Sequence, residues 1–146
     1  MGQRTEGKLM RWPSTLAVVF AVLATAALAA QASAACVVTQ GDHVVLASQG
    51  LDPDVFVWDS ARRLTAYLEG DYDTETVLHH TVLAQPGTKA VAVGCKEGAG
   101  HPKYAKTTLD LVGVKLTDGP SKGHYGWVVA DDVRRPDGRP VTPPTP

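Results

Sequence analysis

Short apolar runs, many of them alternating with polar positions, recur along most of the chain and predict β-strands. The runs are rich in β-branched and aromatic side chains and are bounded by Gly, Pro or Asp residues, a composition typical of strands and their turns. The predicted strands span residues 36–39, 43–47, 55–58, 76–84, 89–95, 109–117 and 125–129.

Two turns are predicted to join these strands into hairpins. In Gln85-Pro86-Gly87-Thr88, proline and glycine stand at the second and third positions of a type II turn, so 76–95 is predicted to form a hairpin. The segment 118–123 holds two glycines and a proline. It turns the chain, so the strand at 125–129 is expected to pair back on the strand at 109–117.

One stretch departs from the strand pattern and predicts a short helix. Asp59 or Ser60 suits the N-cap, and Gly70 stands where a glycine ends many helices. Between them, apolar residues recur at the spacing of one helix face: Ala61, Leu64 and Leu68. The sequence therefore predicts one short helix whose narrow apolar stripe packs on the rest of the domain.

Several short strands, frequent turns and one helix are typical of a small antiparallel barrel or sandwich. We therefore predict a mainly β domain over residues 35–135. From Pro136 onward the chain is rich in proline and polar residues, so 136–146 is predicted to be a disordered tail.

The first 34 residues have the features of a cleavable signal peptide. A basic start with Arg4, Lys8 and Arg11 precedes an uncharged apolar run over 16–30, and Ala32-Ser33-Ala34 has the small-x-small pattern of a cleavage site. The run is shorter than the roughly 20 residues of a membrane-spanning helix. We therefore favour cleavage of the segment, with a retained membrane anchor as the alternative. We predict a secreted or periplasmic protein.

Two cysteines, Cys36 and Cys95, remain after the predicted cleavage. An even number of cysteines in an oxidising compartment favours a disulfide. The alternative is a lipid anchor on Cys36, although Ser33 stands where a lipoprotein signal usually has leucine. The spacing matches neither a CxxC redox motif nor a zinc site.

Two segments resemble bacterial Src-homology-3-like (SH3-like) domains. Residues 113–128 read GVKLTDGPSKGHYGWV and residues 82–93 read VLAQPGTKAVAV; they are similar to the last hairpin of that family and to the hairpin before it. The resemblance covers about residues 76–133. It implies a small SH3-like barrel that binds a peptide, protein or cell-wall ligand on a face formed by loops 98–107 and 119–125.

The candidate chemistry points away from catalysis. The sequence has no G-x-S-x-G elbow and no phosphate-binding loop. Of the five histidines, His79 and His80 are expected on opposite faces of one strand, where they cannot share a metal without distortion. Asp71 to Glu75 offers several oxygens but lacks the calcium-loop pattern. We predict no catalytic residue, metal or cofactor.

The aromatic residues divide into predicted core and predicted surface. We expect Phe56 and Trp127 to fill the core, and we name Trp58, Tyr104 and Tyr125 as candidate ligand-binding residues, since exposed aromatic rings form contact surfaces in binding modules. The net charge of −1 lacks the positive excess that neutralises phosphates, so no nucleic-acid partner is predicted.

Together these features favour an exported, non-enzymatic binding module. A structural or inhibitory envelope protein that acts on one protein partner is the alternative, and an uncharacterised hydrolase is the third possibility. The sequence does not predict the ligand or the oligomeric state.

Overall fold

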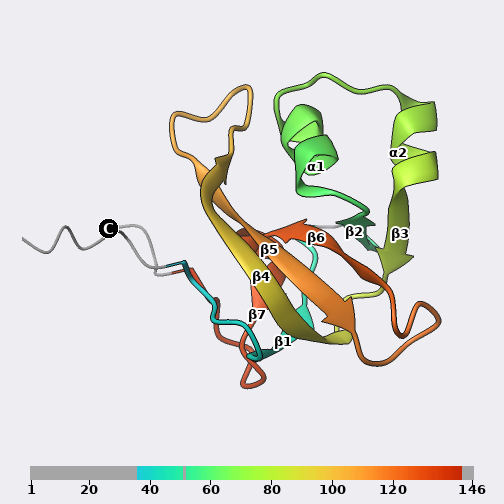
Figure 1. Ribbon diagram of the computed structural model, residues 1–146, viewed down its shortest axis with the longest axis vertical. Coiled ribbons are helices and arrows are strands. Elements are labelled where there is room, and N and C mark those ends of the chain that lie inside the picture. The colour runs from blue at the N-terminus through green and yellow to red at the C-terminus, as the bar shows by residue number, and fades with distance from the viewer. Residues whose placement is uncertain (1–35, 51, 143–146) are drawn as a thin grey trace, which may run out of the picture. The chain divides into compact units, whose positions relative to one another are not determined.

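The computed structural model describes residues 36–50 and 52–142, and most of them belong to one antiparallel sheet (Figure 1). The seven strands follow the order β3-β2-β6-β5-β4-β1-β7. They are β1 (His43–Leu46), β2 (Val55–Trp58), β3 (Thr81–Ala84), β4 (Lys89–Gly100), β5 (Leu109–Leu116), β6 (Tyr125–Val129) and β7 (Val133–Arg134), with helices α1 (Ala61–Leu68) and α2 (Thr74–His80) and a 3₁₀ turn, η1 (Ala130–Asp132). The predicted mainly β, antiparallel fold is confirmed.

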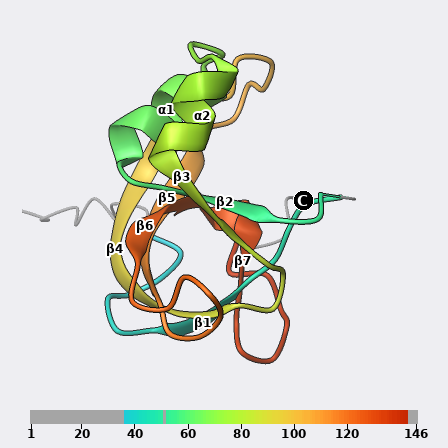
Figure 2. The same ribbon diagram turned by 90° about the vertical axis from the view of Figure 1, so that its right-hand side faces the viewer.

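The sheet curls around a core of small and branched apolar side chains. Figure 2 shows the curl, with both helices at the end of the sheet where the loop joins β4 to β5. Inside the curl pack residues such as Leu46, Val57, Val112, Val114 and Val128, each at most 1% exposed. Among the described residues, no helix has the length and apolar character needed to cross a membrane.

The hairpin of β5 and β6 forms as predicted, with Gly113 opposite Trp127. Gly126 lies where β6 passes β2, and a Cβ atom there would lie 2.5 Å from Val57 Cγ1 and 2.6 Å from the Trp58 carbonyl oxygen. No side chain fits such a gap, so glycine is required for this close approach.

Helix α1 also follows its sequence signals. The Ser60 hydroxyl accepts a hydrogen bond from the Arg63 backbone N–H at 3.3 Å, which satisfies one of the free donors at the helix start. Gly70 follows the helix with φ +83°, a conformation that glycine adopts without steric cost.

The predicted strand at 76–84 is wrong in its first half, which forms helix α2. The Asp73 side chain caps this helix by accepting a hydrogen bond from the Thr76 backbone N–H at 2.7 Å. That cap outweighs the modest strand preference of Thr76 and Val77. The domain therefore has two short helices instead of the one predicted, and His79 and His80 lie in a helical turn.

The predicted hairpin at 76–95 is also wrong, although its turn is present. The Thr88 backbone N–H donates to the Gln85 carbonyl at 3.1 Å, and Gly87 has φ +94°. However, β3 pairs with β2, whereas β4 pairs with β1 and β5. The turn thus carries the chain from one edge of the sheet to its middle instead of joining two neighbours.

Both ends of the described chain differ from the prediction. Residues 36–39 form no strand, but Val38 is buried at 6% exposure. The predicted disordered tail is wrong for residues 136–142, because Val141 is also 6% exposed and Pro140 bridges to Arg134. A tight turn at Gly138, with φ +84°, returns the chain to the core. Residues 143–146 and the predicted signal peptide lie outside the described residues.

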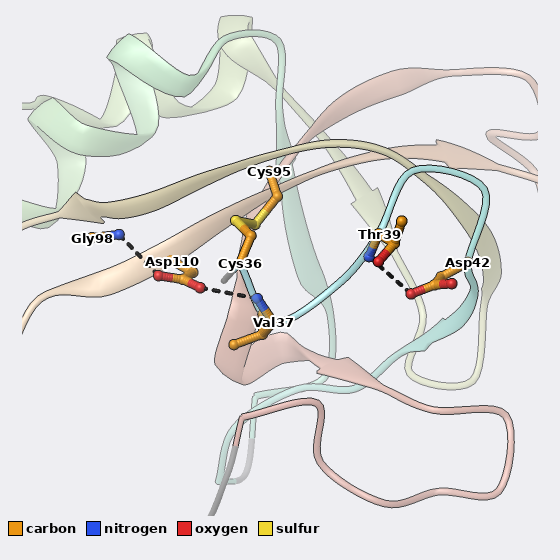
Figure 3. The surroundings of a disulfide bond; sticks show 7 residues. All are labelled: Cys36, Val37, Thr39, Asp42, Cys95, Gly98 and Asp110. Atoms are coloured by element: carbon orange, nitrogen blue, oxygen red, sulfur yellow. Dashed lines mark hydrogen bonds between the residues drawn. A yellow bond between two sulfur atoms is a disulfide. The ribbon is translucent and has the colours of Figure 1, made fainter. Parts of the chain in front are cut away.

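A disulfide and a shared carboxylate hold the first described residues on the sheet (Figure 3). Cys36 is bonded to Cys95 of β4, with 6.1 Å between their Cα atoms, as predicted. The Asp110 carboxylate accepts from the Val37 backbone N–H at 3.2 Å and from the Gly98 backbone N–H at 2.9 Å. This disulfide is consistent with an extracytoplasmic location.

Candidate functional site

Two hollows meet on the face of the domain that carries α1, and Tyr67 and Leu68 of that helix line both of them. The first hollow, which we call the acidic pocket, has a volume of about 130 Å³. Its chemistry comes from six side chains: Asp52, Asp54, Phe56, Trp58, Tyr67 and Asp132. The second, which we call the aromatic groove, is larger, at about 500 Å³.

Strand alternation and helix packing form the apolar wall of the acidic pocket. Phe56 and Trp58 are two positions apart on β2, so both point to the outer face of the curled sheet. Helix α1 covers Trp58, which is 1% exposed and lies 4.9 Å from Tyr67 between ring centroids. Phe56 lies beyond the helix and stays 39% exposed. Phe56 is therefore not a core residue, contrary to the prediction.

Three carboxylates from distant parts of the chain complete this pocket. Asp52 and Asp54 come from the loop between β1 and β2, and Asp132 ends the turn η1. Burial, together with the neighbouring Asp131 carboxylate, raises the pKa of Asp132 to about 6. Arg134 opposes this rise in pKa, but its Nη1 atom donates to the backbone carbonyls of Asp131 and Val133.

The Tyr67 hydroxyl lies in the negative field of the same carboxylates. Burial raises the pKa of Tyr67, and Tyr72, Asp52 and Asp132 raise it further. Both groups thus resist carrying negative charge at this place. Burial disfavours a charge of either sign, but the carboxylates of Asp52, Asp131 and Asp132 also give the pocket a negative field, which favours a positively charged guest.

The aromatic groove runs from the end of α1 to the loop between β4 and β5. Tyr67 and Tyr72 lie 4.5 Å apart between ring centroids, and the Lys103 Nζ atom lies 5.6 Å from the Tyr104 ring. The Lys103 backbone N–H donates to the Leu68 carbonyl at 2.9 Å, which fixes the loop against the helix. Tyr72 is 51% exposed and Tyr104 is 93% exposed.

The three predicted ligand-binding residues do not form one site. Trp58 is buried beneath α1, whereas Tyr104 is exposed in the aromatic groove. Tyr125, 59% exposed, lines a different pocket with His79, His80 and His124. The loops at 98–107 and 119–125 meet opposite ends of β5, so the predicted single face between them does not exist.

Sequence reasoning missed Tyr67, Tyr72 and Asp132. Tyr67 follows Leu64 by three positions and precedes Leu68, so helix periodicity could have placed it beside the predicted apolar stripe. No local pattern distinguishes Asp132 from other turn aspartates, because its surroundings come from the loop at 52–54 and from α1.

The histidines form no evident metal centre. His80 Nδ1 lies 2.8 Å from an Asp59 carboxylate oxygen, which also pairs with Arg63 at 2.8 Å. Among residues 36–50 and 52–142, the one group of three potential ligands that lie close together is Cys36, Cys95 and Asp110. Its two sulfurs are joined in the disulfide, so they are not free to bind a metal.

Comparison of the chain with protein-family models, curated proteins and solved structures finds no match.

Proposed function

We propose that this chain is an exported binding module, without catalytic activity of its own, that holds a peptide, protein or cell-wall ligand in the aromatic groove. The observation that carries the proposal is the exposure of Tyr72 and Tyr104 around a concave surface of about 500 Å³. Tyrosine gives a large contact area at low entropic cost and is enriched in binding surfaces for that reason.

The way the groove is built supports this function. One wall is helix α1, whose Tyr67 ring packs on the buried Trp58 ring, and the other is a loop tied to that helix by the Lys103 backbone. A groove whose walls are held before binding loses less entropy when the ligand arrives.

The proposal includes the SH3-like assignment and export through the signal peptide. The hairpin of β5 and β6, with its G-W-V return strand, supports the first, since it carries the sequence resemblance over 113–128. The Cys36–Cys95 disulfide supports the second, because such bonds persist in oxidising compartments. A structural or inhibitory role toward one protein partner would use the same groove.

The test measures retention of the purified, disulfide-bonded protein on purified cell walls, and its co-purification with one defined protein from an envelope extract. Changing Tyr72 or Tyr104 to Ala should abolish whichever interaction is found. Tyr125→Ala removes a tyrosine whose exposure, 59%, is close to the 51% of Tyr72 and which lies at the far end of β5; it should leave that interaction intact.

Loss of binding with Tyr125→Ala alone would place the ligand at the other end of the domain and overturn the proposal. Turnover of a wall or peptide substrate by the unmodified protein would also overturn it, in favour of a hydrolase.

A further inference from the structure

The acidic pocket has a size that suits a single side chain. Sites for whole small molecules usually enclose about 300–1,000 Å³, whereas this pocket has about 130 Å³. It also opens beside the aromatic groove, because Tyr67 and Leu68 line both hollows. One residue of a longer ligand can therefore enter the pocket while its neighbours lie in the groove.

The charged residues that line the pocket determine which charge the bound side chain can carry. Its wall carries the carboxylates of Asp52, Asp54 and Asp132, and it includes no lysine, arginine or histidine. Arg134 is a cation that acts on Asp132, but its Nη1 atom is engaged by two backbone carbonyls. An anionic ligand would be repelled, whereas a cation would balance charges that now repel one another.

The aromatic wall selects the same chemistry. The faces of tyrosine and phenylalanine rings attract ammonium and guanidinium groups, and they also pack against the methylene stems of lysine and arginine. Phe56 and Tyr67 supply such rings, and the exposed part of Phe56 lies at this pocket. The apolar stem of a lysine or arginine side chain and its charged tip thus both find partners in the acidic pocket.

We infer that the acidic pocket receives one basic side chain, lysine or arginine, of a polypeptide ligand whose neighbouring residues lie in the aromatic groove. This inference rests on the proposed binding function and names the ligand class and the anchoring residue. The carboxylates of Asp52 and Asp132 hold the charged tip, and Tyr67 with Phe56 packs on the stem.

The test uses four fluorescein-labelled peptides in a serine-glycine background that differ only at the central residue, which is arginine, lysine, citrulline or norleucine. Fluorescence anisotropy with the purified, disulfide-bonded protein measures each affinity. The two basic peptides should bind about tenfold more tightly than citrulline or norleucine, since removing one partner of a close charge pair has at least this effect.

Two pocket variants and one matched control locate the binding. Asp132→Asn and Asp52→Asn should each weaken binding of the arginine peptide about tenfold. Glu97→Gln removes the same charge from an exposed site on β4 and should change affinity less than about twofold. Far-ultraviolet circular dichroism verifies that each variant is folded, and either pocket variant alone is sufficient for the test.

A change of pH adds a readout specific to the pocket. Asp132 is surrounded by Asp131 on η1, Asp52 and Gln49 on the β1–β2 loop, Tyr67 on α1 and Arg134 on β7. As the pH falls from 7 to 5, Asp132 takes up a proton and the arginine peptide should bind less tightly. Its affinity for the Asp132→Asn variant should change much less.

Equal binding of the arginine and citrulline peptides would overturn the inference, and so would an equal loss of affinity in Glu97→Gln and Asp132→Asn. The proposed function has a separate point of failure. If Tyr72→Ala and Tyr104→Ala abolish binding of the natural ligand while Asp132→Asn does not affect it, the groove is the binding site and the inference about the pocket is wrong.

Discussion

Replacing Asp132 with Asn should stabilise the domain near neutral pH and have progressively less effect as the pH falls. The half-buried carboxylate has a pKa of about 6, against its ordinary value of 3.8, chiefly because burial disfavours its charge. The folded protein therefore holds the proton over a pH range in which the unfolded chain has already released it. Stability is lost as the pH rises through this range, because ionisation costs more in the folded state.

The size of the effect follows from the two pKa values. Between 3.8 and about 6, each pH unit corresponds to about 1.4 kcal/mol, so the full change in the free energy of unfolding is at most about 3 kcal/mol. Asparagine has similar shape and no charge to bury. The stability of Asp132→Asn minus that of the unmodified protein should thus grow by about 2–3 kcal/mol between pH 4 and pH 7.

Urea denaturation followed by tryptophan fluorescence, at several pH values from 4 to 7, measures this difference. The Glu97→Gln variant serves as control, since Glu97 is exposed on β4 and its removal should leave the pH dependence unchanged. Parallel stability curves for Asp132→Asn and the unmodified protein would refute the reasoning, because they would show that Asp132 titrates alike in the folded and unfolded states.

Three further predictions concern stability. Reduction of the Cys36–Cys95 bond, which joins residues 59 positions apart, should lower the free energy of unfolding by about 4 kcal/mol, as measured by urea titration with and without reductant. Gly126→Ala should destabilise the domain by about 3 kcal/mol or more, because its Cβ atom would meet Val57 and the Trp58 backbone. In the matched control Gly94→Ala, the nearest atom outside the neighbouring residues is 3.6 Å away, and thermal unfolding should show a smaller loss. Ser60→Ala removes the α1 cap and should cost about 1 kcal/mol in the same assay.

Elements governed by local chemistry were predictable from the sequence. Ser60 and Gly70 bracket α1 as expected, and the glycine-rich segment before Tyr125 folds β6 onto β5. Each of these features depends on residues close together in the chain. Local preference therefore suffices to place them.

Features that depend on distant partners were not predictable. The turn at Pro86-Gly87 forms, but only the whole sheet decides that β3 pairs with β2. Strand alternation puts Phe56 and Trp58 on one face, yet which of the two rings is buried depends on which of them α1 covers.

The candidate site belongs to this second kind. Asp52, Tyr67 and Asp132 lie far apart in the sequence and meet only after the loop, α1 and η1 have packed together. Of the aromatic residues named from the sequence, Tyr104 lies in the groove and Tyr125 lies elsewhere. Both are exposed, as expected, but Trp58, the third residue named, is buried beneath α1, and the distance between Tyr104 and Tyr125 was not predictable.

Mapping of backbone amide chemical shifts during titration with the arginine peptide tests most directly where the ligand lies. We predict that the largest changes fall within residues 48–49, 52–58, 64–72, 103–104 and 129–132, which include the residues that line the acidic pocket and the aromatic groove. Changes centred on His124 and Tyr125, which line the pocket beside α2, would contradict it.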